Sequence, residues 1–275
     1  MTKSTHTPRC LMFVMALLLT STPALAESSP AEAVPGVDAI VEKANCVAYY
    51  QGNSGRSDVL IVIKDDKGNE RMRQATMLRK DTGSDDCGTQ KSYVYFHRPA
   101  DLNKTAFLVW KNPGKADDRW LYLSALDLVK RIADSDKRTS FVGSHFFYED
   151  VTGRNIHDDV HVLAETNDQY YVLESTPKDP ASVEFTRATI WIDRSNYMPM
   201  KVEHYDRSDA LYRTYEALAV ETIQGYPTVT RARISDSHIK GETTITFSNV
   251  HYDVDLDEGV FAERYLRNPP RKYLQ

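Results

Sequence analysis

Only a few stretches of the sequence bring histidine and acidic residues close enough together to form a candidate metal or catalytic site. The stretch His157-Asp158-Asp159-Val160-His161 offers imidazole and carboxylate groups, which metal ions accept as ligands. On a strand, His157, Asp159 and His161 would share one face, and Asp158 would point away. Because no H-E-x-x-H motif or second ligand cluster accompanies this stretch, we interpret it as a solvated strand start and predict no metal site.

A second candidate is the adjacent pair Glu149-Asp150, with His145 four residues before it. Paired carboxylates act as acid and base in glycosidases, and a histidine beside aromatic residues can titrate near neutral pH. Adjacent residues seldom converge on one substrate, so a helix cap or a salt bridge is the favoured interpretation of the pair. The alternative, a periplasmic hydrolase, requires all three side chains to lie within hydrogen-bond reach of one another.

The remaining signatures of catalysis are missing from the sequence. Ser54 lies between glycines, but Arg56 occupies the place of the second glycine of a G-x-S-x-G nucleophile elbow. The sequence has no glycine-rich phosphate loop. We therefore predict no catalytic residues, no cofactor and no enzymatic activity.

The first 26 residues have the pattern of an export signal. Lys3 and Arg9 precede the apolar run Leu11–Leu19, and Ala24-Leu25-Ala26 forms a small-x-small cleavage site. The run is too short to span a bilayer. We predict cleavage near Ala26, a flexible leader over residues 27–36, one domain over 37–275, and a periplasmic location.

The charge of the mature chain limits its partners. Without residues 1–26 the chain has 32 basic and 39 acidic residues, a formal charge of −7. Dispersed, mildly acidic charge does not favour nucleic acid or an anionic membrane surface. We expect no nucleic-acid partner and a monomeric protein.

Two cysteines, Cys46 and Cys87, remain after cleavage. An even number in an oxidising compartment predicts a disulfide, which would stabilise the fold by about 3–4 kcal/mol in the chain-entropy model. It would join an N-terminal helix to the turn Thr82–Gly88. Two separate thiols remain the alternative.

Short segments of alternating or β-branched character dominate the rest of the chain and predict strands. They are separated by short polar turns without helical crossovers, as in an antiparallel meander of eleven to thirteen strands. The predicted strands are Asp58–Lys64, Arg71–Arg79, Tyr93–His97, Thr105–Lys111, Arg119–Ser124, Val160–Thr166, Tyr170–Ser175, Glu184–Asp193, Met200–Asp206, Leu211–Val220, Thr228–Ser235 and Thr243–Tyr252. So many sequential strands must curl into a barrel or part-barrel to bury one face.

Three segments do not have the alternating or β-branched pattern that predicts a strand. Val37–Ala48 has apolar residues at helical spacing and predicts an amphipathic helix that either covers the sheet or forms part of a lid. Ser140–Asp150 contains four aromatic residues, too many for one face of a strand, so we interpret it as a loop or short helix that plugs an end of the sheet. Gly259–Leu266 predicts a short helix or turn.

The central stretch resembles the LolA-like family of periplasmic outer-membrane lipoprotein-sorting proteins, in particular the branch found beside exporters of the resistance-nodulation-division (RND) type. Three pieces carry the resemblance, and the branch usually has Asp where this chain has His145. The pieces are Arg98-Pro99-Ala100-Asp101 with Lys104-Thr105-Ala106-Phe107-Leu108; Trp120-Leu121-Tyr122-Leu123 with Lys130-Arg131-Ile132; and Ser140-Phe141-Val142-Gly143-Ser144 with Tyr148-Glu149-Asp150. The resemblance implies an open half-barrel, mainly β, with helices inserted in its concavity.

A curved sheet with more strands than its interior can fill leaves an apolar cavity suited to acyl chains. Any single aromatic residue is more often ordinary core than ligand-binding wall. The candidate cavity and plug residues are Phe107, Val109, Trp120, Tyr122, Phe141, Phe146, Phe147, Trp191, Ile245 and Phe247. The headgroup would remain at the mouth, beside the candidate rim charges Arg98, Lys130 and Arg131.

The resemblance implies a carrier that shields acyl chains of a lipoprotein or related lipid and moves them toward the outer membrane. The alternative is an accessory protein of an RND-type exporter that acts by protein contact. In that case a strand edge or the loop Lys111–Asp118 would matter more than the cavity.

Overall fold

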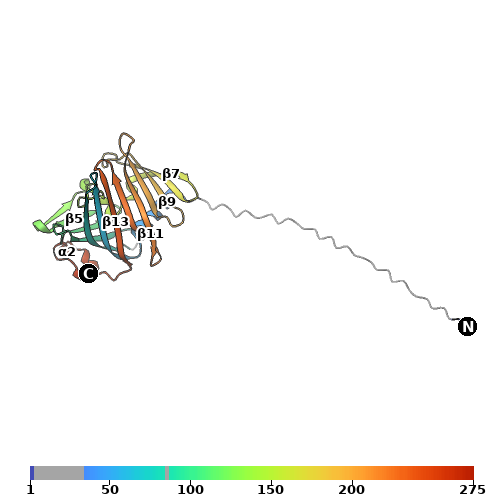
Figure 1. The fold of residues 1–275 in the computed structure, drawn as a ribbon, viewed down its shortest axis with the longest axis horizontal. Helices are drawn as coiled ribbons and strands as arrows, with labels where there is room; N and C mark the ends of the chain where they lie inside the picture. The colour runs from blue at the N-terminus through green and yellow to red at the C-terminus, as the bar shows by residue number, and fades with distance from the viewer. Residues whose placement is uncertain (3–33, 84–86) are drawn as a thin grey trace. The chain divides into compact units, whose positions relative to one another are not determined.

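A computed structural model describes residues 1–2, 34–83 and 87–275 of the chain. The predicted signal peptide and the leader as far as residue 33 lie outside the described residues. Residues from Pro35 to Gln275 form one compact unit (Figure 1). Within the described residues, no helix has both the length and the apolar character needed to cross a membrane.

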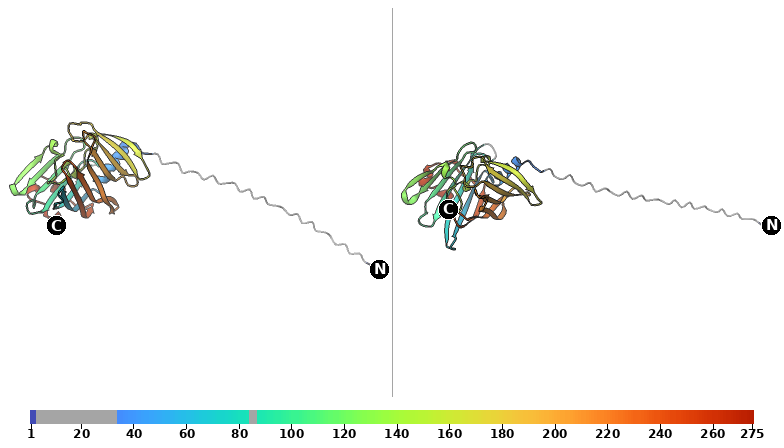
Figure 2. Two further views of the ribbon diagram at one scale, coloured as in Figure 1. Left: turned by 45° about the horizontal axis from the view of Figure 1, so that its top comes forward. Right: turned by 90° about the horizontal axis from the view of Figure 1, so that it is seen from above.

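The compact unit is built on a single sheet of thirteen strands, all neighbours antiparallel (Figures 1 and 2). The first six strands follow one another in chain order from the middle of the sheet to one edge. They are β1 (Ser54–Asp65), β2 (Glu70–Asp81), β3 (Gln90–Arg98), β4 (Ala106–Lys111), β5 (Asp118–Leu123) and β6 (Leu128–Ile132). The other seven begin at the opposite edge and return to the middle. They are β7 (Asp159–Thr166), β8 (Tyr170–Pro177), β9 (Arg187–Asp193), β10 (Pro199–Tyr205), β11 (Leu211–Ile223), β12 (Tyr226–Asp236) and β13 (Gly241–Tyr252).

Pairing between β1 and β13 joins the two halves, so that the last strand lies beside the first. The two edges of the sheet are β6 and β7, which are consecutive in the chain. No ladder joins these edges in the part of the chain that the structure describes, and the curved sheet stays open. The prediction of a mainly β, open antiparallel sheet is confirmed. The sequence missed only β6, whose five residues include the charged pair Lys130-Arg131 and do not alternate.

The segment between β6 and β7 forms the plug. It contains the short 3₁₀ helices η2 (Asp134–Asp136), η3 (Glu149–Val151) and η4 (Ile156–Asp158). An isolated bridge joins Ser140 to Phe147 and closes a loop between them. Phe141 and Tyr148 are buried against Phe107 of β4, with ring centroids 5.2 Å from its centroid in both cases. Aromatic burial therefore fixes the plug on one face of the sheet, called here the inner face.

Helix α1 (Val37–Tyr49) covers another part of the inner face, close to the predicted bounds. Its apolar residues Ile40, Val41 and Ala44 are buried at helical spacing against Leu173 and Ile192 of β8 and β9. The predicted disulfide is confirmed: Cys46 of α1 is bonded to Cys87, and it ties the helix to the connection between β2 and β3.

The outer face of β3, β4 and β5 is covered by the end of the chain. There the 3₁₀ helix η5 (Glu258–Phe261), helix α2 (Arg264–Arg267) and the 3₁₀ helix η6 (Arg271–Tyr273) follow β13. Phe261 and Leu266 are fully buried in a core cluster with Tyr93 and Leu108. The prediction of a short helix or turn at Gly259–Leu266 agrees with this segment. One further 3₁₀ helix, η1 (Ser124–Leu126), joins β5 to β6.

Candidate functional site

A cavity of about 410 Å³ lies between the inner face, the plug and α1. One end of it is apolar, because alternate residues of neighbouring strands point into it. Val59 and Ile61 of β1 and Ile245 and Phe247 of β13 contribute to this wall. The register places Ile61 opposite Ile245 and Val59 opposite Phe247, so that the four side chains form one continuous apolar surface.

Four of the predicted cavity residues line the cavity: Phe141 and Phe146 of the plug, and Ile245 and Phe247 of β13. Phe107 and Val109 face the same side of the sheet but are fully buried beneath the plug, where they belong to the core. Phe147 is also buried, and its ring packs against the guanidinium groups of Arg138 and Arg213.

Trp120, Tyr122 and Trp191 do not lie on the cavity wall, and the structure corrects their assignment. Trp120 and Tyr122 belong to the outer cluster beneath the C-terminal helices. On β9 the neighbours of Trp191, Ile190 and Ile192, line the cavity, so Trp191 faces the outer side, where Lys201 lies over its ring. Alternation along a strand sends adjacent residues to opposite faces.

The predicted rim charges are also placed away from the cavity. Arg98, Lys130 and Arg131 are exposed, and none of them lines it. Arg131 is hydrogen-bonded to Asp118 and lies over Trp120 on the outer face. The structure therefore gives these three residues no position beside a ligand in the cavity.

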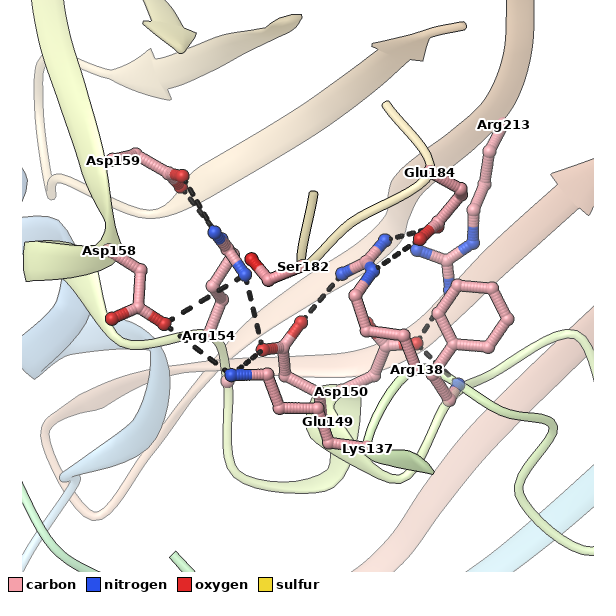
Figure 3. Close-up of polar contacts among 12 residues, drawn as sticks. Lys137, Arg138, Glu149, Asp150, Arg154, Asp158, Asp159, Ser182, Glu184 and Arg213 are labelled. Carbon is pink, nitrogen blue, oxygen red and sulfur yellow. Dashed lines mark hydrogen bonds and ion pairs between the residues drawn. The ribbon is translucent and has the colours of Figure 1, made fainter. Parts of the chain in front are cut away.

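Charged residues also line the cavity, among them Arg138, Glu149 and Arg154, and Figure 3 shows the polar contacts between them. We call this part of the cavity its polar end. Glu149 is 2% exposed and lies between two arginines, 2.6 Å from Arg138 Nη1 and 3.3 Å from Arg154 Nη1. Arg154 continues to Asp159 through two hydrogen bonds of 2.8 Å, and Arg138 continues to Glu184 through bonds of 2.8 and 2.6 Å. This network joins the plug to β7 and to the segment before β9.

The protonation of the network follows from these contacts. Burial acts to raise the pKa of Glu149, but the positive charges of Arg138 and Arg154 outweigh it and hold that pKa below its ordinary value. Burial likewise opposes ionisation of Glu184, yet hydrogen bonds from Arg138 and Tyr212 lower its pKa to about 2. Both carboxylates are therefore ionised at neutral pH and hold the arginines in place.

The three residues of the hydrolase alternative are held apart by different partners. Glu149 is paired with arginines, as the salt-bridge interpretation predicted. Asp150 accepts a hydrogen bond of 2.6 Å from Arg213. His145 is 5% exposed, and its Nδ1 lies 2.8 Å from Thr243 Oγ1. Burial lowers the pKa of this histidine. No hydrogen bond among the described residues joins any two of the three side chains, so the arrangement that this alternative required is not present.

The His157–His161 stretch begins differently from its prediction. His157 belongs to the 3₁₀ helix η4, and the strand starts only at Asp159, which is bonded to Arg154. Both ring nitrogens of His161 have partners, Ser175 Oγ at 2.7 Å and Ile156 O at 2.8 Å. His157, Asp159 and His161 therefore do not share one strand face, because His157 lies outside the strand.

The arginines at the polar end were missed by the sequence analysis. Arg213 is 2% exposed and lies near the start of β11, on the same face as Tyr215. The available signal was that Arg213 alternates in phase with the aromatic Tyr215, which places both side chains on one face of the strand. Arg138 and Arg154 lie in the irregular plug segment, where no periodicity indicates which side chains turn inward.

An open antiparallel sheet with a covered cavity on its inner face defines the LolA-like architecture, and comparisons with solved structures agree. A DUF1329 family protein from Desulfovibrio piger is 29% identical and has a TM-score of 0.75, with 84% of this chain and 98% of that chain covered. A putative outer membrane lipoprotein-sorting protein domain from Vibrio parahaemolyticus is 27% identical with the same TM-score and coverage. A LolA superfamily protein from Nitrosomonas europaea is 25% identical with a TM-score of 0.64, covering 84% of this chain and 100% of that one.

A protein-family model described as "-like: Uncharacterized protein" matches residues 88–268, more than half of the chain, and the chain belongs to that family. Its fold is LolA-like, as the sequence resemblance predicted. No curated protein matches the sequence.

Proposed function

We propose that this protein is a periplasmic carrier that binds an acyl chain of a lipid or lipoprotein in the cavity and moves it toward the outer membrane. The observation that supports this most is the continuous apolar wall of Val59, Ile61, Ile245 and Phe247 in a covered cavity. The export-type first 26 residues and the disulfide favour the periplasm. The similar Vibrio structure is described as a lipoprotein-sorting protein domain, which supports a related cargo.

The size of the cavity limits the cargo. Pockets for small ligands have volumes of about 300–1,000 Å³, and 410 Å³ is near the lower end of this range. Burial contributes about 0.8 kcal/mol for each methylene group, so one long chain supplies enough apolar contact for binding. These magnitudes favour one inserted chain over several.

Loading in this proposal involves movement of the plug and α1, which border the cavity. In this proposal the plug and α1 separate from the inner face to admit the chain. The disulfide between Cys46 and Cys87 keeps one end of α1 attached while the rest moves. The ion pairs of Glu149 and Asp150 hold the plug in the closed position.

Filling the cavity tests the proposal. Ile245→Trp places a larger side chain in the apolar wall, and Thr246→Trp places the same side chain on the outer face of the same strand. We expect the first variant to weaken binding of a fluorescent fatty-acyl probe at least about tenfold, because the inserted ring occupies the chain's volume. The second should bind like the wild type. Equal affinities of both variants would contradict a ligand in this cavity.

A second candidate, contact with a membrane exporter, is favoured by the apolar side chains at both sheet edges. Leu128 of β6 is 48% exposed, and Val160 and Val162 of β7 are 51% and 58% exposed. Edge strands with exposed backbone groups can pair with another protein. Val160→Lys with Val162→Lys would abolish co-purification with such a partner and leave probe binding unchanged. Unchanged co-purification of this double variant would count against contact through the edge strand β7.

A further inference from the structure

The polar end of the cavity contains three uncharged groups that the ion-pair network does not use. Tyr49, the last residue of α1, lines the cavity together with His204 of β10 and Tyr215 of β11. In the register of β10 and β11, His204 is directly opposite Arg213, and Tyr215 is two residues farther along on the same face. His204 and Tyr215 are therefore diagonal neighbours.

These groups are free to bind a ligand. His204 Nδ1 is buried without a hydrogen-bond partner among residues 34–83 and 87–275. Its ring is fixed by edge-on packing against Phe185, at 4.9 Å between ring centroids. Neither the Tyr49 nor the Tyr215 hydroxyl is hydrogen-bonded to a described residue. A buried polar group without a partner costs free energy, and a ligand that supplies one recovers it.

All three groups are neutral. Burial raises the pKa of Tyr49 and Tyr215, and the neighbouring Asp150 raises both further, so the hydroxyls remain protonated donors. Burial lowers the pKa of His204 well below its ordinary value, and Arg213 adds to the effect. The imidazole is therefore uncharged, with one donor and one acceptor nitrogen.

The charged groups around them are already matched. Arg138 and Arg154 are paired with Glu149, and Arg213 is paired with Asp150. Arg213 Nε has no hydrogen-bond partner among the described residues, but it lies 3.8 Å from the second counter-charge, Asp236 Oδ2. A charged headgroup would lose its hydration here and find no counter-charge that is not engaged. An uncharged oxygen, in contrast, would meet two phenol donors and the imidazole.

We propose that Tyr49, Tyr215 and His204 form a polar subsite that binds the ester or hydroxyl oxygens of a neutral acyl lipid, with the acyl chain along the β1 and β13 wall. This inference rests on the proposed carrier function and names the class of its ligand, an uncharged acyl ester of the monoacylglycerol type. It reverses the sequence-based expectation that the headgroup stays at a charged rim.

Competition with a fluorescent fatty-acyl probe tests the subsite, using four ligands with one chain length: monopalmitoylglycerol, palmitate, hexadecylamine and hexadecane. We expect monopalmitoylglycerol to bind at least about tenfold more tightly than the other three, because only it satisfies the free donors without bringing a charge. Tyr49→Phe and Tyr215→Phe should each weaken it about three- to tenfold and change hexadecane binding less than about twofold.

Tyr226→Phe is the matched control, because Tyr226 of β12 does not line the cavity and its hydroxyl lies 3.5 Å from Asp253. Stronger binding of palmitate or hexadecylamine, or equal effects of all three Tyr→Phe variants, would overturn the subsite while leaving a carrier in place. Failure of every ligand and of the probe to bind would overturn the carrier proposal itself.

Discussion

The two faces of the sheet around β3, β4 and β5 are both buried, but they are buried in different ways. On the outer face the C-terminal segment packs Phe261 and Leu266 directly onto Tyr93 and Leu108. On the inner face the plug packs Phe141 and Tyr148 onto Phe107, and a cavity lies beside Phe141. The comparison shows that burial of aromatic residues does not by itself mark a binding wall, since the same strands contribute to both faces.

The largest effect should come from the outer face. Phe261→Ala removes a fully buried ring from the C-terminal segment. We expect the free energy of unfolding to fall by about 3–5 kcal/mol, because the lost contacts leave a cavity. Chemical denaturation measures this loss. Affinity of the remaining folded protein for an acyl probe should not change, and a large loss of affinity would mean that the two faces are not independent.

An effect nearly as large should come from the polar end of the inner face. Glu149→Gln leaves the buried Arg138 and Arg154 with less counter-charge, and we expect a loss of about 3–5 kcal/mol in the free energy of unfolding. Glu258→Gln is the matched control, since its pair with Lys91 is on the surface and should contribute about 0–1 kcal/mol. Similar losses from both variants would show that burial does not distinguish the two pairs.

Removal of the disulfide should cost somewhat less. The double variant Cys46→Ser and Cys87→Ser frees α1 from the connection between β2 and β3, and we expect a loss of about 3–4 kcal/mol because the unfolded chain gains freedom. Stopped-flow measurement of probe release should also show faster exchange. Unchanged exchange with reduced stability would place the entry route away from α1.

The smallest effect is an acid-dependent one. Glu184 has a folded pKa of about 2 against an ordinary value of 4.5, so its stabilising contribution is complete above pH 4.5 and is lost as the pH falls toward 2. In denaturation series from pH 6 to pH 2, the free energy of unfolding should therefore fall less steeply for Glu184→Gln than for the wild type. Parallel curves would show that this carboxyl is not linked to folding.

The sequence predicted twelve of the thirteen strands, the helix, the plug and the disulfide because each depends on local pattern or composition. It could not assign faces on β5, where Trp120, Leu121, Tyr122 and Leu123 are all apolar or aromatic, so a period of two has no distinctive phase. Leu121 and Leu123 pack on the inner side, and the two larger residues meet the C-terminal segment. The sequence also did not indicate the long-range ion pairs, because Arg138 and Glu184 are 46 positions apart and Asp150 and Arg213 are 63 positions apart.

The account depends most on an acyl ligand in the cavity, and native mass spectrometry with lipid extraction tests it most directly. Mature wild-type protein and the Ile245→Trp variant would be isolated from the periplasm without detergent. We predict an uncharged acyl lipid bound to the wild type and its loss from the variant. Wild-type protein free of lipid, which also fails to take up lipidated cargo, would contradict the carrier and favour a function through protein contact.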